Sequence, residues 1–162
     1  MMRKFLSMVL LGAAAVALNA AEYEVASPDG RVQAKVVYDN GTKYSLSYDG
    51  KTLIVDSPLS MTLSDGTVWG ASKVRKASVK SIDEPINATF YRKAVVANAY
   101  NELNLDYGTY NLVLRAYDDG FAYRWESDKR KPYKVVAEQA TFNFAEDWNM
   151  YATYTHKYEL RP

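Results

Sequence analysis

The 162-residue sequence contains no cysteine and only one histidine, His156. Without cysteine there is no disulfide, no thiolate metal ligand and no cysteine nucleophile. A single histidine rules out a histidine metal cluster, and its place near the end of the chain indicates a surface or junction role rather than catalysis. A glycine-rich phosphate loop, a nucleophile elbow and a zinc motif are also missing. The chain therefore offers no positive sign of catalysis of its own.

The sequence also lacks an apolar run long enough for a membrane anchor. Arg3 and Lys4 precede an apolar stretch from Phe5 to about Leu18, and the small residues Ala20 and Ala21 follow it. This layout is typical of a secretory signal peptide, and the stretch is shorter than the ~20 residues of a membrane-spanning helix. We expect residues 1–21 to be removed and the protein to be exported to the periplasm or the cell exterior, with no membrane attachment after cleavage.

An excess of charge of one sign is absent as well. Removal of residues 1–21 takes away two of the 20 basic residues, and the remaining 18 stand against 19 acidic ones. Such a surface has no long-range attraction for nucleic acid or for anionic lipid. The short basic cluster Asp128 to Tyr133, which contains Pro132, is interpreted as a solvated loop. Nucleic acid is not an expected partner.

What the chain does contain is period-two alternation of apolar and polar residues, broken by turn dipeptides, with almost no helical period. Asp49-Gly50 predicts a two-residue hairpin turn, and Asp65-Gly66 repeats the pattern. The expected strands are Val32–Tyr38, Lys43–Tyr48, Val74–Ile82, Ala88–Val96, Asn101–Tyr107, Tyr110–Tyr117, Phe121–Glu126, Tyr133–Phe144 and Asn149–His156. About ten short strands in one domain indicate an all-β, antiparallel sandwich or barrel.

The densest group of reactive side chains is "RAYDDGFAYRW", Arg115 to Trp125. Its alternation predicts a hairpin in which Asp118-Asp119-Gly120 forms a three-residue connection with a left-handed glycine. Adjacent turn carboxylates rarely face each other across the 5 to 9.5 Å that glycosidic chemistry requires, so we interpret both as turn residues. We expect Arg115 and Arg124 to pair with Glu126 or with a carboxylate on a neighbouring strand.

Tyrosine is abundant, with 14 residues. Tyrosine faces stack on sugars, but aromatic side chains are also enriched in half-buried strands, and the second explanation needs no ligand. Both interpretations stay open for individual tyrosines.

With these features in view, the chain resembles the amino-terminal domain of glycoside hydrolase family 97, a secreted α-glucosidase and α-galactosidase family of Bacteroidetes. The resemblance covers essentially the whole chain after the signal peptide. It is carried, in the family's order, by "SPDGRVQAKV" (27–36), "YSLSYDGKTLI" (44–54), "SPLSMTL" (57–63), "YNEL" (100–103) and "LRAYDDGFAYRW" (114–125).

The resemblance implies a two-sheet β-super-sandwich of the galactose-mutarotase-like type over residues 22–150. Residues 151–162 would begin the junction to a catalytic (β/α)8 barrel, which has no counterpart in this sequence and needs about 250 residues. The family further implies that the domain lends a glutamate to a calcium site beside the catalytic centre. Glu159 lies at about that place, where a solvated junction carboxylate is the alternative. Calcium takes 6 to 8 oxygen ligands, so Glu159 alone would bind it weakly.

We therefore interpret the chain as the sandwich domain of a family 97 α-glycosidase, predicted inactive alone, with no catalytic residue of its own. Its expected partners are the barrel of the full-length enzyme and an α-linked oligosaccharide. The alternative is a stand-alone periplasmic carbohydrate-binding or assembly module without turnover. The sequence does not choose between glucoside and galactoside, or between inverting and retaining chemistry.

Overall fold

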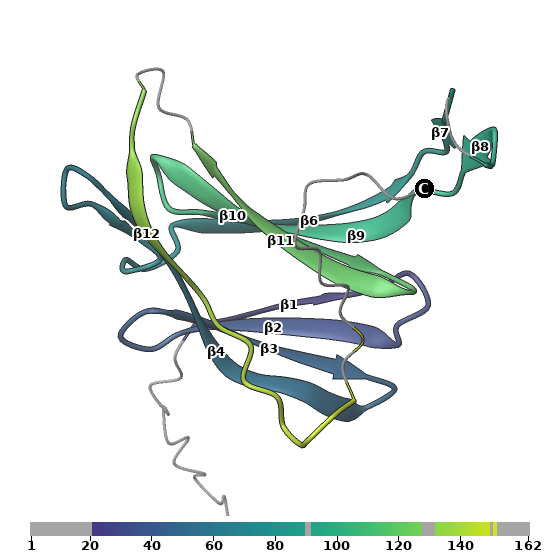
Figure 1. The fold of residues 1–162 in the computed structure, drawn as a ribbon, viewed down its shortest axis with the longest axis horizontal. Helices are drawn as coiled ribbons and strands as arrows, with labels where there is room; N and C mark the ends of the chain where they lie inside the picture. Colours follow the sequence, from purple (N-terminus) through teal and green to yellow (C-terminus); the bar gives the residue numbers. More distant parts are fainter. Residues whose placement is uncertain (1–20, 90–91, 128–131, 150, 152–162) are drawn as a thin grey trace, which may run out of the picture.

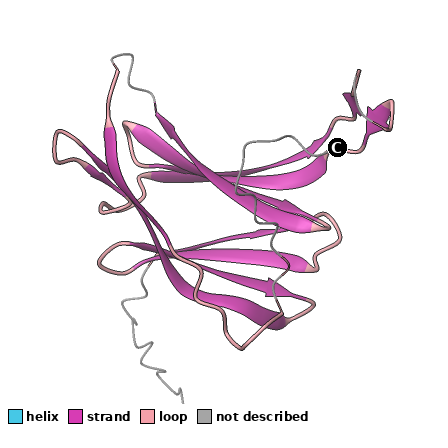
Figure 2. Ribbon diagram, in the orientation of Figure 1, coloured by secondary structure: helices cyan, strands magenta, loops and turns pink. Residues whose placement is uncertain are grey.

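The computed structural model describes residues 21–89, 92–127, 132–149 and 151. These residues form strands and turns without a helix (Figure 2). In chain order the strands are β1 (Glu22–Ala26), β2 (Val32–Tyr38), β3 (Thr42–Tyr48), β4 (Lys51–Leu63), β5 (Val68–Trp69), β6 (Lys76–Asp83), β7 (Ile86–Asn87), β8 (Val95–Val96), β9 (Ala99–Asp106), β10 (Tyr110–Tyr117), β11 (Gly120–Ser127) and β12 (Val135–Ala140).

The strands build two antiparallel sheets that face each other, as the sandwich prediction required (Figure 1). The first sheet has the order β1-β2-β3-β4-β12, with β5 also pairing with β4. The second sheet has the order β11-β10-β9-β6, and β7 and β8 form a small separate ribbon. Because β1 packs on β9 and β10 and β2 packs on β10 and β11, β6 and β12 lie at opposite flanks of the sandwich.

The core lies between the two sheets and follows the alternation of the sequence. One face of β10 buries Leu112, Leu114 and Ala116, and the return strand β11 packs Phe121 and Trp125 against the same core, together with Tyr123. Tyr44 of β3 is fully buried and lies beside Phe121 and Tyr123, with ring centroids 5.9 and 5.8 Å away. Burying a large side chain of this kind stabilises the fold by roughly 1.5 to 3 kcal/mol.

The turns differ in detail from expectation. Asp49 and Gly50 both have positive φ (48° and 74°), which confirms the two-residue hairpin turn. At Asp65 the prediction was wrong, because only Gly66 has positive φ and its N–H donates to the Leu63 carbonyl at 3.0 Å. That is a type I turn over Ser64 and Asp65 with glycine in the bulge position.

The turn between β10 and β11 also differs from the expected three-residue connection. Tyr117 pairs directly with Gly120, so the connection consists of Asp118 and Asp119 alone. None of these residues, Gly120 included, has a positive φ. Since every residue of β10 from Tyr110 to Tyr117 has a partner on β11, the strand register leaves no room for an extra turn residue.

One expected strand is absent. Residues Ala88 to Val96 were predicted to form a single strand, but among the described residues of this stretch only Val95 and Val96 do so, in the ribbon with β7. A strand is stable only when its backbone groups have a partner, and local composition does not supply one. The expected strand Asn149–His156 lies almost wholly outside the described residues, as do the signal peptide and most of the basic cluster at Asp128 to Tyr133.

Candidate functional site

The acidic turn of the β10–β11 hairpin has a structural use. The Asp118 carboxylate accepts a hydrogen bond from the backbone N–H of Asp29 at 2.9 Å, across 89 positions of sequence. Asp29 lies in the turn between β1 and β2, so this bond ties the second sheet to the first. The interpretation of Asp118 as a turn residue agrees with this contact, and it adds a link between the sheets that the sequence did not reveal.

The turn that receives Asp118 is held by the "SPDGR" segment. Asp29 accepts hydrogen bonds from the Ser27 hydroxyl (2.6 Å), from the Arg31 backbone N–H (3.0 Å) and from Arg31 Nε (2.7 Å). These bonds, the one from Ser27 first, hold the pKa of the Asp29 carboxyl well below its usual range. Arg31 in turn donates to the Tyr48 hydroxyl at 2.6 Å, next to the β3–β4 turn. Asp29 therefore stays ionised and serves as an organiser of turns, not as a proton donor.

A second charged group lies on the outer face of the second sheet. The Glu102 side chain on β9 is almost fully buried, with the residue 5% exposed, and it contacts Arg115 Nε at 2.7 Å and Lys80 Nζ at 2.8 Å. Burial alone would raise the pKa of the Glu102 carboxyl, but the hydrogen bonds from Lys80 and Arg115 outweigh it and lower that pKa. A carboxylate paired with two cations is a poor general acid.

The two arginines of the hairpin behave as the sequence predicted. Arg115 pairs with Glu102 on the neighbouring strand and places its guanidinium over the Tyr100 ring, 4.6 Å from the centroid. Arg124 forms an ion pair with Glu126 on its own strand. The sequence motif "YNEL" contained Glu102, but its role was missed because the burial of that side chain depends on which strands lie on either side of β9.

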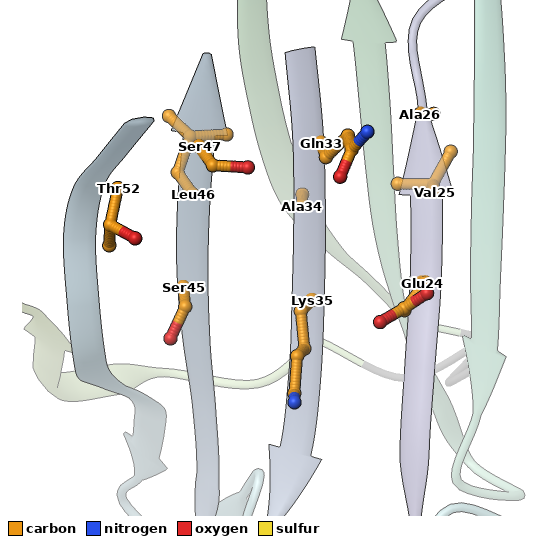
Figure 3. Close-up of a pocket in the computed structure, with 10 residues that line it drawn as sticks. All are labelled: Glu24, Val25, Ala26, Gln33, Ala34, Lys35, Ser45, Leu46, Ser47 and Thr52. Carbon is orange, nitrogen blue, oxygen red and sulfur yellow. The ribbon is translucent and has the colours of Figure 1, made fainter. Parts of the chain in front are cut away.

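The outer face of the first sheet carries a shallow groove of about 410 Å³. Figure 3 shows its lining, in which the polar side chains of β1 to β4 project from neighbouring strands. Gln33 pairs with Ser47 and Lys35 with Ser45 across β2 and β3, and Ser47 pairs with Thr52 across β3 and β4. The short serines between longer side chains produce the hollow.

The chemistry of this groove is that of hydrogen bonding. Among the described residues that line it, Glu24 is the only carboxylate and none is aromatic. Glycosidic catalysis needs two carboxyl groups, so the groove does not supply that chemistry. Lys35 keeps its charge, because an ion pair with Glu22 raises the pKa of its ammonium group. The alternation of the sequence predicts which side chains of β2 and β3 point outward, but it does not predict the depth of the groove.

Several of the described tyrosines are buried. Tyr44, Tyr100, Tyr107 and Tyr110 are buried, and Tyr110 stacks on both Trp69 (5.0 Å) and Tyr107 (4.8 Å). Burial raises the pKa of Tyr107 to about 12. The large exposed rings of this type in the described part of the chain are Tyr48, Tyr133 and Tyr151. Within the described residues, these three are the tyrosine rings most open to stacking on a sugar.

A calcium site is not formed by the residues that the structure describes. Among them, no three histidine, aspartate or glutamate side chains come together as metal ligands. Glu159, the carboxylate expected to contribute to calcium, and His156 both lie outside the described residues. Within the same residues there is no helix that could span a membrane.

Residues 25–161 match the sequence model of the family described as "Glycosyl-hydrolase 97 N-terminal". A retaining alpha-galactosidase of Bacteroides thetaiotaomicron is 38% identical over 128 residues, which is 78% of this chain and 19% of that enzyme. The chain thus spans about a fifth of the length of this relative.

Solved structures agree with the fold. A structure named beta-arabinopyranosidase superposes with a TM-score of 0.68 and 28% identity, covering 76% of this chain and 21% of the other. A family 97 enzyme of Pseudoalteromonas sp. strain K8, solved in complex with panose, gives a TM-score of 0.66 at 23% identity, over 76% and 20% of the two chains. The family match covers both sheets, and with it the turns joined by Asp29 and Asp118. This chain belongs to glycoside hydrolase family 97, as the N-terminal β-sandwich domain of such an enzyme.

Proposed function

We propose that this domain packs on the catalytic barrel of a secreted family 97 α-glycosidase and forms one wall of its sugar-binding cleft. The observation that carries the proposal is the exposed apolar surface of β12 and the segment after it, which we call the β12 flank. The β12 flank consists of Val135, Val136, Phe142, Phe144 and Trp148, and all five side chains are exposed. Exposed apolar side chains gathered in one segment of the chain are typical of interaction sites in soluble proteins.

The β12 flank differs in its packing from the central strands β2, β3, β9 and β10, all of which bury two or more side chains. All six residues of β12 are exposed, although their partners Leu59 and Leu63 on β4 are 1% exposed. Backbone pairing therefore holds β12 in place while the second sheet leaves it uncovered. A catalytic domain that covered this strand would bury the apolar side chains of the β12 flank and fix the orientation of the sandwich.

The substrate class that we propose is the α-galactoside, cleaved with retention of configuration. Its support is the 38% identity to an enzyme named retaining alpha-galactosidase. Retention needs a nucleophile and an acid/base carboxyl group about 5 to 5.5 Å apart, and we assign both to the barrel. Calcium would be shared in the same way, with Glu159 as one oxygen ligand and the remaining ligands from the barrel. We also propose that the signal peptide at residues 1–21 directs export of the enzyme.

The groove of Figure 3 favours a second candidate, a carbohydrate-binding or assembly module without turnover. Its serine, threonine and glutamine side chains present the donors and acceptors that sugar hydroxyls require. The described lining of the groove offers no aromatic ring for stacking, which counts against tight binding.

One set of measurements distinguishes the two functions. The gene is sequenced beyond the codon for Pro162 to learn whether the reading frame continues. The 162-residue chain and any longer product are then assayed with nitrophenyl α-galactoside and nitrophenyl α-glucoside. We expect hydrolysis of the galactoside by the longer product and none by the 162-residue chain. Turnover by the shorter chain, or a stop codon beside an intact neighbouring gene, would contradict the domain role.

Binding is measured by titrating galacto- and malto-oligosaccharides into the 162-residue chain by calorimetry. The domain role predicts no heat of binding. The module role predicts binding that is lost in the double variant Gln33→Ala, Ser47→Ala and kept in a control variant Ser60→Ala, because Ser60 does not line the groove.

A further inference from the structure

Strand β6 leaves one edge of the second sheet without a partner among the described residues. It pairs with β9 on one side only. Val79 of β6 lies directly opposite Leu103 of β9, so the two side chains share the core-facing side of the sheet. Leu103 is 2% exposed, whereas Val79 is 58% exposed. The inward face of β6 therefore extends beyond the cover of the first sheet.

The direction of the backbone groups on β6 follows from the hydrogen bonds of its neighbours. Glu84 N–H donates to the Asn98 carbonyl and Arg75 N–H to the Asp106 carbonyl, so the even-numbered residues of β9 face β6. Tyr107 N–H donates to the Tyr110 carbonyl, so the odd-numbered residues face β10. In an antiparallel ladder, alternate residues bond to opposite sides. Ala77, Val79 and Ser81 consequently point their N–H and C=O groups toward the free edge.

This edge has little protection against pairing with another strand. Proteins commonly guard such edges with proline, a bulge or charged side chains, lysine above all. Over its eight residues β6 has no proline and no register shift. Both lysines of β6 are exposed, but the Lys80 ammonium group is engaged by the Glu102 carboxylate of β9 at 2.8 Å, on the side away from the free edge.

We propose that β6 is a homodimer interface, in which two copies of the chain join their second sheets edge to edge, antiparallel, about a twofold axis at Val79. Such a contact is isologous, because each copy presents the same strand to the other. The two sheets would then form one continuous sheet across the axis, with Val79 of each copy directly opposite Val79 of the partner.

Charge and side-chain direction favour this register over its two nearest alternatives. Antiparallel partners face the same side of a sheet, so a one-residue slip would place inward side chains opposite outward ones. A shift that centres the axis on Lys80 sets two like charges opposite each other, and a shift that centres it on Ser78 sets Lys76 opposite Lys80; both are unfavourable. The register centred on Val79 instead places Lys80 opposite Ser78 and Lys76 opposite Ile82. It also covers the exposed Val79 side chain.

A second copy fits this edge better than a charged partner does. With 20 basic and 19 acidic residues the whole chain is close to neutral, so two copies do not repel each other at long range. The strand itself has Lys76 at its start, and Asp83 and Glu84 lie at and just after its end. In the antiparallel arrangement each basic start lies beside the acidic end of the partner strand.

The absence of cysteine makes this proposal directly testable. Directly opposed residues in hydrogen-bonded pairs have Cα atoms about 5.5 Å apart, which lies within the range for a disulfide. Val79→Cys should therefore give a disulfide-linked dimer under mild oxidation, seen on a non-reducing gel. Ala77→Cys is the register control, because its two copies would lie four residues apart along the strands. Val68→Cys is the control for an exposed residue outside the edge.

Sedimentation of the unmodified 162-residue chain completes the test. We expect a concentration-dependent monomer–dimer equilibrium that Val79→Lys shifts to monomer, while circular dichroism shows an unchanged fold. The proposal is overturned if the unmodified chain stays monomeric, if Ala77→Cys or Val68→Cys cross-links as fast as Val79→Cys, or if Val79→Lys remains dimeric. A monomer would instead indicate that another segment of the enzyme covers β6.

Discussion

Replacing Arg115 with methionine should expose the cost of the buried carboxylate at Glu102. The substitution keeps most of the apolar stem of the side chain and removes the guanidinium that contacts Glu102 at 2.7 Å. Breaking a buried ion pair by removing one partner costs about 3 to 5 kcal/mol. Lys80 remains at 2.8 Å and Arg115 is itself partly exposed, so we expect a loss of about 2 to 3 kcal/mol in the free energy of unfolding at pH 7.

The pH dependence of this loss identifies its cause. In the native chain the pKa of Glu102 is lowered, so its pairing stabilises the fold above the unfolded pKa and that stabilisation disappears as the pH falls through the folded pKa. Without Arg115 the effect of burial gains weight and the pKa of Glu102 rises. The carboxyl then takes up a proton on mild acidification, so the difference between native chain and variant should shrink between pH 7 and about pH 4.

Urea unfolding followed by tryptophan fluorescence measures both quantities. The double variant Glu102→Gln, Arg115→Met should lose less stability than the two single variants added together, because the second substitution removes the stranded charge. Arg124→Met is the matched control, since its ion pair with Glu126 is exposed and should contribute under about 1 kcal/mol. A loss for Arg115→Met that does not change with pH, or that equals the loss for Arg124→Met, would refute the reasoning.

Three further predictions rest on other parts of the fold. Gly70→Ala should destabilise the chain by about 2 kcal/mol or more in a thermal melt. Gly70 has φ +88°, and a Cβ there would lie 2.6 Å from the Leu59 carbonyl oxygen. Gly30→Ala is the control and should cost about half as much, because the space around Gly30 is open. Asp118→Ala should lower the free energy of unfolding by about 1 kcal/mol, because the Asp29 N–H loses its acceptor. Asp118→Asn keeps an acceptor oxygen and should retain most of that stability. Equal losses in the two variants would contradict the hydrogen bond as the cause. Burial raises the pKa of Tyr107 and Tyr44 to about 12. The contribution of these two residues to the free energy of unfolding is therefore complete below about pH 10 and is lost as the pH rises toward 12. An ultraviolet titration should show a group of tyrosines that ionise late, and Tyr107→Phe should reduce their number by one.

Period-two alternation predicted much of the sandwich because it reports directly on which side chains face the core. Both bounds of β2 and of β10 agree with the sequence prediction. Phe121, Tyr123 and Trp125 share one side of β11 as expected. The alternation failed at Ala88 to Val96, where the described residues pair only with nearby β7 and with no distant strand.

The charged sites were predictable only in part, because their properties depend on contacts between distant strands. Asp118 could be recognised as a turn residue, but its bond to Asp29 spans two sheets. Glu102 could not be distinguished from a solvated carboxylate until Lys80 and Arg115 were known to lie on the two strands that flank it. The groove of Figure 3 arises from differences in side-chain length across four strands, which no single stretch of sequence displays.

The two proposed surfaces lie on different sheets and at opposite flanks, and this separates the two proposals. The β12 flank belongs to the edge of the first sheet beyond β4, whereas β6 is the edge of the second sheet beyond β9. Since β1 packs on β9 and β10, β6 lies on the β1 side of the sandwich, at the other end of the strand order from β12. A barrel seated on the β12 flank would therefore leave β6 free to pair with a second copy. Dimerisation and barrel packing should then be lost independently, Val79→Lys removing the first and Val136→Lys the second.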